Sequence, residues 1–518
     1  MILKLVGHEY KYAVEQIMLT LFPLEKPVYS EDPISHLSDP LSRSCDIISG
    51  SGDLDNRSAA PTPCPCDLFA ESRLSCGPVF AQCTTIIRSG NKSFRGVAKI
   101  SRDKLTDKLV TDRLLQRIIK QSFYRSASNI ITNPPVWGSL TGIRPAQIAA
   151  KIMEKGKSAG FAANKLEREY YVSPVRAKMC VSAAQTAIDL KQSLKPKDIA
   201  LYIGIPFCPT RCTYCSFVSN SVEKSFGMIK PFVKTLLSEI EAAAKLVREY
   251  DLQVSSIYIG GGTPTTLPTD SLDAMMSAIS RSFDLQNIRE YTFEAGRPET
   301  ITQEKLQIIR QYGADRICVN PQSMSDKVLT AIGRNHSSKD VLNAVQLVKN
   351  YGFYLNLDVI AGLPSDSLNG FKDTIDTILT LNPENVTIHT LSLKKGSKIM
   401  LEKTSLPSGT DVGKMLDYAA IKLGKCGFEP YYLYRQKFTS GGFENTGWCM
   451  PGHEGIYNIC MMEELCTVLA LGGGGATKLV NTNGRIERIF NAKYPKEYIS
   501  LNDKLAAKYD AIRDFMQH

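Results

Sequence analysis

Three cysteines lie close together in the middle of the chain, directly after an apolar, strand-like run at residues 199–205. Cys208, Cys212 and Cys215 are separated first by three residues and then by two, and Tyr214 precedes the last of them. Zinc sites space their cysteines differently, and ferredoxin runs carry a fourth cysteine. Three thiolates leave one of the four irons of a cube without a protein ligand, free to bind a small molecule. The spacing therefore predicts a [4Fe-4S] cluster with one open iron.

This spacing resembles the signature of radical S-adenosylmethionine (SAM) proteins, and buried or zinc-bound thiols are the alternative. A glycine-rich turn at residues 260–264 follows a strand-like run. Because glycine has no Cβ, the backbone there can approach the SAM ammonium and offer carbonyl oxygens to it. Glu294 ends another such run, where it would pair with the ammonium or form an ordinary surface ion pair. Amide, guanidinium and carboxylate groups on later loops suit the SAM carboxylate and ribose. The SAM site predicted in this way contains Gly260, Gly261, Gly262, Thr263, Glu294, Gln322, Arg334 and Asp358.

The elements that must position these residues alternate along the chain. After residue 197, apolar strand-like runs are separated by amphipathic, helix-like stretches. Six such units predict an α/β fold, an incomplete (βα)6 barrel with parallel strands and right-handed crossovers. The loops after the strands would share one face with the cysteine loop, and the chemistry should concentrate there. The strand-like runs lie near residues 199, 254, 290, 315, 354 and 386.

The composition changes on both sides of this barrel. Residues 84–100 alternate as strands do, and residues 108–123 and 145–157 have helical spacing, which predicts an α+β N-terminal domain. A segment near 25–83, rich in Ser, Pro, Asp and Gly, reads as a loop or partly disordered insertion. The segment contains five cysteines, which lack a familiar ligand spacing and are either ordinary thiols or an auxiliary metal site. They are Cys45, Cys64, Cys66, Cys76 and Cys83. The predicted domains are 1–190, the radical SAM barrel at 197–400, and a substrate-covering domain at 401–518.

The chain has 518 residues, of which 43% are hydrophobic, so it can bury a large core. No apolar run approaches the roughly 20 residues of a membrane helix, and residues 1–22 lack a signal-peptide layout. We therefore expect a cytoplasmic protein without a membrane partner, whose 14 cysteines are thiols or metal ligands. The net charge of +10 suits an anionic partner, but no block of Lys or Arg points to nucleic acid.

Taken together, the motifs resemble the oxygen-independent coproporphyrinogen III oxidases of the radical SAM class, in particular the coproporphyrinogen dehydrogenase branch, with its related heme chaperones. The likeness covers roughly residues 197–480, and residues 140–145 resemble the longer members of that branch. It is carried by Tyr202, 205–215, 260–264, Glu294, Gln322, 333–336, 358–364, 443–445, 451–454, Tyr457 and Asn458.

The resemblance implies a reaction. A reduced cluster would cleave SAM to methionine and a 5′-deoxyadenosyl radical, which takes a hydrogen atom from a propionate. Loss of carbon dioxide leaves a vinyl group, so that coproporphyrinogen III becomes protoporphyrinogen IX. Tyr202 and Glu294 would lie closest to this chemistry, with Tyr202 beside SAM. We also expect a monomer, an electron donor such as flavodoxin or ferredoxin, and an external electron acceptor.

Two departures keep other functions open. The best-studied oxidases carry a further cysteine where this chain has Phe217. Chaperone relatives bind heme with a His-Asn pair followed by Tyr-Trp, whereas residues 457–462 here contain neither His nor Trp. The alternatives are a heme-binding, chaperone-like protein without decarboxylase activity, or a radical SAM enzyme acting on another substrate such as a nucleic acid.

Four further residues have two interpretations each. His336 is either a proton-transfer group or, as lone histidines more often are, structural. Cys449, Cys460 and Cys466 either ligate heme or a metal, or are ordinary buried thiols.

Overall fold

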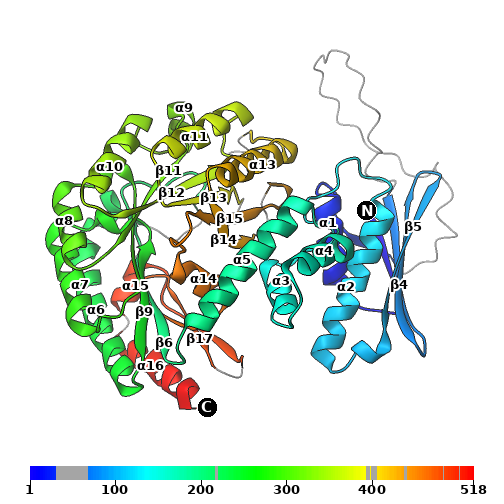
Figure 1. The fold of residues 1–518 in the computed structure, drawn as a ribbon, viewed down its shortest axis with the longest axis horizontal. Coiled ribbons are helices and arrows are strands. Elements are labelled where there is room, and N and C mark those ends of the chain that lie inside the picture. The colour runs from blue at the N-terminus through cyan, green and yellow to red at the C-terminus, as the bar shows by residue number, and fades with distance from the viewer. Residues whose placement is uncertain are drawn as a thin grey trace. The chain divides into compact units, whose positions relative to one another are not determined.

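The computed structural model describes residues 1–30, 68–215, 220–392, 405–436, 440–481, 484–500 and 502–517, together with Ser397 and Ile399. The chain forms two compact units (Figure 1). The first contains Met1–Thr141 and Lys165–Arg176, and the second contains Gly142–Asn164 and Ala177–His518. Each unit is described by itself below. None of the described helices has the length and hydrophobicity to cross a membrane.

The first unit is a mixed sheet covered by two helices, α1 (Lys11–Leu21) and α2 (Lys108–Ala127). Its described strands pair in the order β2-β1-β3-β4-β5. Strands β4 and β5 form a hairpin in which Ser89 pairs with Lys92, and Gly90 in the two-residue loop has a φ of +54°, as such tight turns require. Asp107 begins α2 by accepting a hydrogen bond from the Val110 amide. The strands are β1 (Ile2–Val6), β2 (Val28–Tyr29), β3 (Leu68–Cys76), β4 (Phe80–Ser89) and β5 (Lys92–Ser101).

The insertion predicted near 25–83 is wrong for residues 68–76 and 80–83, which lie in β3 and β4. Strand β3 pairs with β1 on one side and with β4 on the other, so its backbone is hydrogen-bonded on both sides although several of its side chains are polar. Cys76 is exposed, whereas Cys83 is buried and accepts a hydrogen bond from Ser122. The other three cysteines of the predicted insertion, Cys45, Cys64 and Cys66, lie outside the described residues, so the auxiliary metal site stays a prediction.

The second unit is built on one large sheet whose central strands are parallel and confirm the predicted partial barrel. All six predicted strands are present, and β16 extends the parallel array beside β6. In Figure 1 the helices α6 (Val222–Glu249), α7 (Thr269–Ser282), α8 (Gln303–Gln311), α10 (Ser338–Asn350) and α11 (Leu368–Thr380) line the outside of these strands. The parallel strands are β16 (Thr467–Gly472), β6 (Asp198–Ile205), β9 (Gln253–Gly261), β10 (Glu290–Gly296), β11 (Arg316–Gln322), β12 (Tyr354–Ala361) and β13 (Asn385–Thr390).

The C-terminal segment completes this sheet at both edges. On one edge, β15 (Glu444–Cys449) pairs with β13 and β14 (Glu429–Arg435) pairs with β15, both antiparallel. On the other edge, β17 (Ala476–Val480) and β18 (Ile486–Phe490) continue from β16. Helices α13 (Gly409–Lys425), α15 (Pro495–Ile499) and α16 (Asn502–Gln517) belong to the same unit.

The structure thus divides the chain differently from the predicted domains 1–190, 197–400 and 401–518. The predicted segments 197–400 and 401–518 belong to one compact unit, because backbone hydrogen bonds join β15 to β13 and β16 to β6. Helices α3 (Ala146–Met153) and most of α5 (Pro174–Ser193) belong to the second unit rather than to an N-terminal domain. These contacts are long-range in sequence, and composition does not reveal them.

Candidate active site

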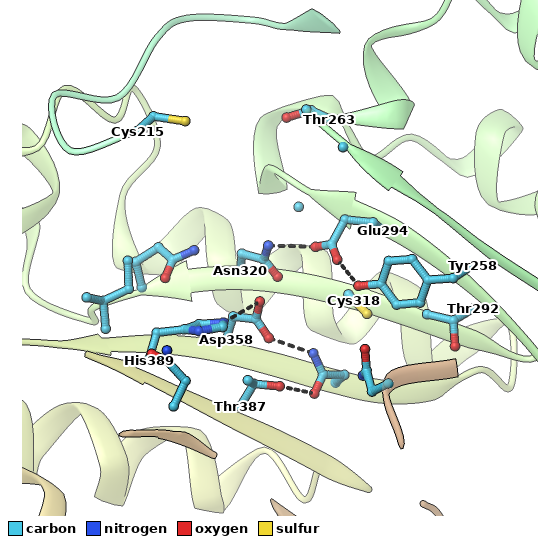
Figure 2. Close-up of a pocket in the computed structure, with 18 of the residues that line it drawn as sticks. Cys215, Tyr258, Thr263, Thr292, Glu294, Cys318, Asn320, Asp358, Thr387 and His389 are labelled. Carbon is cyan, nitrogen blue, oxygen red and sulfur yellow. Dashed lines mark hydrogen bonds and ion pairs between the residues drawn. The ribbon is translucent and has the colours of Figure 1, made fainter. Parts of the chain in front are cut away.

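A cavity of about 520 Å³ opens at the carboxyl ends of the parallel strands, as parallel barrels typically place their sites. Side chains of β6 and β9 to β13 line it together with β14, β15 and α14 (Ile456–Glu463). Figure 2 shows part of this wall. Every predicted site residue except Gly260 lines the cavity, and Gly260 lies against Tyr258, where a Cβ would come within 2.8 Å of the ring. The predicted residues in its wall are Tyr202, Cys208, Cys212, Cys215, Gly261, Gly262, Thr263, Glu294, Gln322, Arg334 and Asp358.

The cysteine loop, residues 208–215, follows β6 and is held by backbone contacts. The amide of Cys215 donates to the carbonyl of Cys212 (3.2 Å), and the amide of Thr213 donates to the carbonyl of Ile332 (3.1 Å). Gly262 packs so tightly on the loop that a Cβ there would lie 2.4 Å from the carbonyl oxygen of Phe207. The glycine-rich turn therefore has two roles. It lets the start of the cysteine loop pack closely against it, and it forms part of the cavity wall.

The donors around the thiols fit a cluster. Thr263 Oγ1 lies 3.5 Å from Cys208 Sγ, and Arg297 Nη2 lies 3.0 Å from Cys212 Sγ, so donors point at two of the sulfurs. Among the described residues, no three His, Cys, Asp or Glu side chains converge as the ligands of a single metal ion would. Each thiolate of a cube binds a different iron, so cluster ligands surround a larger volume than ligands of one ion do.

Glu294 lies in a polar group within the cavity. Its Oε1 accepts a hydrogen bond from Asn320 Nδ2 (2.6 Å), and its Oε2 accepts one from the Tyr258 hydroxyl (Figure 2). Burial, followed by the neighbouring charge of Asp358, raises the pKa of Glu294 to about 7. A cationic ligand would stabilise the ionised form of this carboxylate, which is the chemistry predicted for the SAM ammonium.

Asp358 belongs to a second polar group, whose residues lie within β12 and β13 rather than on the loops that follow them (Figure 2). Its Oδ1 accepts from Asn356 Nδ2 (2.7 Å), its Oδ2 lies 3.4 Å from His389 Nε2, and Thr387 Oγ1 donates to Asn356 Oδ1 (3.0 Å). Burial opposes the charge of His389, but the hydrogen bond and charge of Asp358 raise its pKa overall. Sequence reasoning missed His389, although its position next to the end of a predicted strand was a usable signal.

Several buried polar atoms in the cavity wall have no partner. Among the described side chains these include Asn320 Oδ1, Gln322 Oε1 and Arg334 Nε. Arg334 otherwise donates to the Asn320 carbonyl (2.8 Å) and to the Tyr214 hydroxyl (3.1 Å). Buried donors and acceptors are normally satisfied, so open ones that line a cavity fit a polar ligand such as SAM.

His336 does not line the cavity. Its side chain is fully buried, and Nδ1 pairs with Glu299 Oε2 at 3.0 Å. The geometry therefore favours the structural interpretation of this histidine. Cys449, Cys460 and Cys466 are likewise buried within a hydrophobic cluster and do not line the cavity, so ordinary buried thiols remain the simpler interpretation.

A set of buried and partly buried tyrosines, here called the tyrosine wall, forms another part of the cavity. The rings of Tyr258 and Tyr457 stack with centroids 4.7 Å apart, and Tyr202 stacks on Tyr457 at 5.9 Å. Tyr431 and Tyr432 on β14 complete the wall, packed in the same hydrophobic cluster. Burial raises the pKa of Tyr202, so this hydroxyl stays protonated. The wall supplies apolar surface with a few hydroxyl groups, which suits an organic ligand.

A glycine turn, Gly472–Gly475, lies against β6 and contributes Gly474 and Gly475 to the cavity. A Cβ on Gly472 would lie 2.2 Å from the Gly204 carbonyl oxygen, and one on Gly475 would lie 3.3 Å from the Tyr202 ring. Glu239 of α6 holds the turn by accepting a hydrogen bond from the Gly472 amide (2.7 Å). Lys508 of α16 pairs with the same carboxylate at 2.8 Å, and Glu239 is fully buried.

The motif at residues 140–145 serves the cavity indirectly. Arg144 Nη1 pairs with Glu464 Oε2 (2.5 Å) immediately after α14, and the Ile143 carbonyl accepts from the Arg435 amide at the end of β14 (2.8 Å). Both α14 and β14 carry residues of the tyrosine wall. The sequence alone does not predict this supporting role, because Arg144 and Glu464 are 320 residues apart in the chain.

Comparison with known proteins identifies a superfamily and several relatives. The radical SAM superfamily model matches residues 202–378. The oxygen-independent coproporphyrinogen-III oxidase-like protein HemZ of Bacillus subtilis is 37% identical over 373 residues, which cover 70% of this chain and 74% of HemZ. The heme chaperone HemW of Buchnera aphidicola is 27% identical over 322 residues, covering 62% and 80%. The structure of coproporphyrinogen III oxidase (HemN) from Escherichia coli aligns with a TM-score of 0.49 and 20% identity, over 62% of this chain and 72% of that one.

The partial barrel and the cysteine loop define a radical SAM protein, whose cofactors are a [4Fe-4S] cluster and SAM. The chain belongs to the oxygen-independent coproporphyrinogen-III oxidase-like family within this class. Relatives of the chain carry two kinds of name, oxidase and heme chaperone, so family membership leaves the reaction open.

Proposed function

We propose that this protein oxidatively decarboxylates two propionates of coproporphyrinogen III to vinyl groups, which yields protoporphyrinogen IX. Each propionate loses a hydrogen atom, one electron and carbon dioxide, and an external acceptor takes the electron. When bound, the cluster and SAM supply the 5′-deoxyadenosyl radical that accepts the hydrogen atom. The observation that carries the proposal is that Cys208, Cys212 and Cys215 line the same cavity as the tyrosine wall. An organic substrate against that wall would share the cavity with the cofactor.

The residues of the chain would bind and orient the reactants. In this proposal Glu294 holds the SAM ammonium, while Gln322, Arg334 and Asp358 offer hydrogen-bonding groups to its carboxylate and ribose. The unpartnered atoms of Gln322 and Arg334 support this assignment. Tyr202 and its stacked neighbours offer apolar ring surface that shields the reactants from solvent and restricts how they lie.

The second candidate is a heme-binding, chaperone-like protein, and the HemW relatives favour it. The residues that line the cavity from α14 argue against the chaperone-like function. Tyr457 and Asn458 line the cavity where the chaperones are expected to carry His-Asn. The one histidine among the described lining residues is His389, which lies on β13 rather than on α14 and pairs with Asp358.

The test is anaerobic incubation of cluster-reconstituted protein with SAM, a reductant and coproporphyrinogen III. Mass spectrometry would follow 5′-deoxyadenosine and vinyl-bearing porphyrin, with the Cys212→Ala variant as the control. Both products in the wild-type protein, and neither in the variant, are the expected result. Deoxyadenosine without porphyrin conversion would reject the decarboxylase, and stoichiometric heme binding would then select the chaperone-like function.

A further inference from the structure

Arg297 is a buried cation beside the cysteine loop, directly after β10. Its side chain is only 3% exposed. One nitrogen, Nη2, donates to Cys212 Sγ at 3.0 Å and to the Thr210 carbonyl oxygen at 2.9 Å. A guanidinium in this position touches a sulfur that we assign to the cluster and the backbone of the loop that presents it.

The guanidinium is held from its other side. Arg297 Nη1 pairs with Glu299 Oε1 at 3.3 Å, and Glu299 Oε2 in turn contacts His336 Nδ1 at 3.0 Å. Pro298 starts the short 3-10 helix that carries Glu299, which restricts the backbone between the two charged groups. The contacts with Thr210 and Glu299 therefore fix the direction in which Arg297 points, and His336 acts through Glu299.

We propose that Arg297 is a positioning and tuning residue that raises the reduction potential of the cluster through its hydrogen bond to Cys212. Reduction adds one negative charge to a cluster already surrounded by thiolates. A buried cation stabilises the reduced state more than the oxidised one, and a hydrogen bond to a ligating sulfur acts in the same direction. Partners that orient such a donor fix its effect on the cluster.

This inference rests on Cys212 as a cluster ligand and is independent of the substrate. The test uses full-length Arg297→Gln protein reconstituted anaerobically, with iron content measured first. The midpoint potential is then determined without porphyrinogen by redox titration followed by electron paramagnetic resonance. At a fixed solution potential, the ratio of reduced to oxidised cluster should fall about tenfold, equivalent to a midpoint lower by about 59 mV for one electron.

Two companion variants make the result specific. Arg297→Lys keeps the charge but loses the fork of donors, so its midpoint should lie between those of wild type and Arg297→Gln. Arg281→Gln removes an exposed arginine from α7 and should leave the midpoint unchanged. An unchanged midpoint in either Arg297 variant with a full cluster overturns the inference. If neither variant retains a cluster, Arg297 is a structural requirement rather than a tuning residue, which overturns it as well.

Discussion

The cysteine loop and the tyrosine wall line one cavity but are built differently. The loop takes its three thiols from eight consecutive residues, and hydrogen bonds to neighbouring backbone and side chains hold it. The wall draws its rings from β6, β9, β14 and α14, which span residues 202–457, and packing within a hydrophobic cluster holds it. Substitutions in the two regions should therefore have different effects. Changes in the loop should remove the cofactor, whereas changes that loosen the wall should lower the stability of the fold.

The largest effect is expected in the cysteine loop. Cys212→Ala should abolish the absorbance of the cluster and SAM cleavage, because a cube with one thiolate removed is under-ligated. The thermal stability of the cluster-free protein should change little, since Cys212 is only partly buried. Cys426→Ala, at an exposed cysteine, is the matched control. Retained SAM cleavage in the Cys212 variant would overturn the assignment of the cluster ligands.

The glycine turn that lies against Tyr202 of the tyrosine wall should respond in the opposite way, by a loss of stability. Glu239→Ala removes the buried carboxylate that holds the glycine turn and leaves the Lys508 ammonium without an anionic partner, so we expect a loss of about 3–5 kcal/mol in the free energy of unfolding. Glu249→Gln is the control, because Glu249 also lies on α6 and pairs with Arg513 of α16, but the pair is partly exposed and should contribute less than about 1 kcal/mol. Denaturant unfolding measures both. Equal losses would contradict the proposed role of burial.

The third substitution is at Glu294, which lines the cavity that both regions share. Glu294→Ala should weaken SAM binding by about tenfold to a hundredfold, the value of a hydrogen bond to a charged group, and leave the iron content intact. Equilibrium binding of SAM to the reconstituted protein checks this. Unaltered affinity would reject the contact between Glu294 and the ammonium.

The smallest effect is a pH dependence of the same contact. Because the pKa of Glu294 is raised to about 7, the carboxyl is largely protonated below that pH and ionised above it. A SAM ammonium prefers the ionised form, so SAM affinity should rise as the pH increases through about 7 and then level off. In Glu294→Gln this step should disappear. A step of equal size in that variant would assign the titration to another group.

The sequence predicted the strands of the barrel and most of the residues assigned to the candidate site because both signals are local. Six apolar runs separated by amphipathic stretches determine β6 and β9 to β13, and the cysteine spacing lies within one loop. Glu294 could be singled out because it ends such a run, and Gln322 and Asp358 because loops at the strand ends of a parallel barrel share one face. The structure places Gln322 at the last position of β11 and Asp358 inside β12 rather than on loops. The insertion near 25–83 was overextended because β3 has no clean alternation and depends on its neighbours for pairing.

By itself the sequence determined the class of chemistry, because three thiolates at this spacing specify the kind of cofactor whatever surrounds them. Only the tertiary structure decided that Arg297 reaches Cys212, that Glu239 holds the glycine turn, and that Arg144 supports α14. These contacts join residues from 85 to 320 positions apart, and burial gives them their strength. Neither separation nor burial is encoded in a local pattern, because both arise only when the strands have paired and the core has closed.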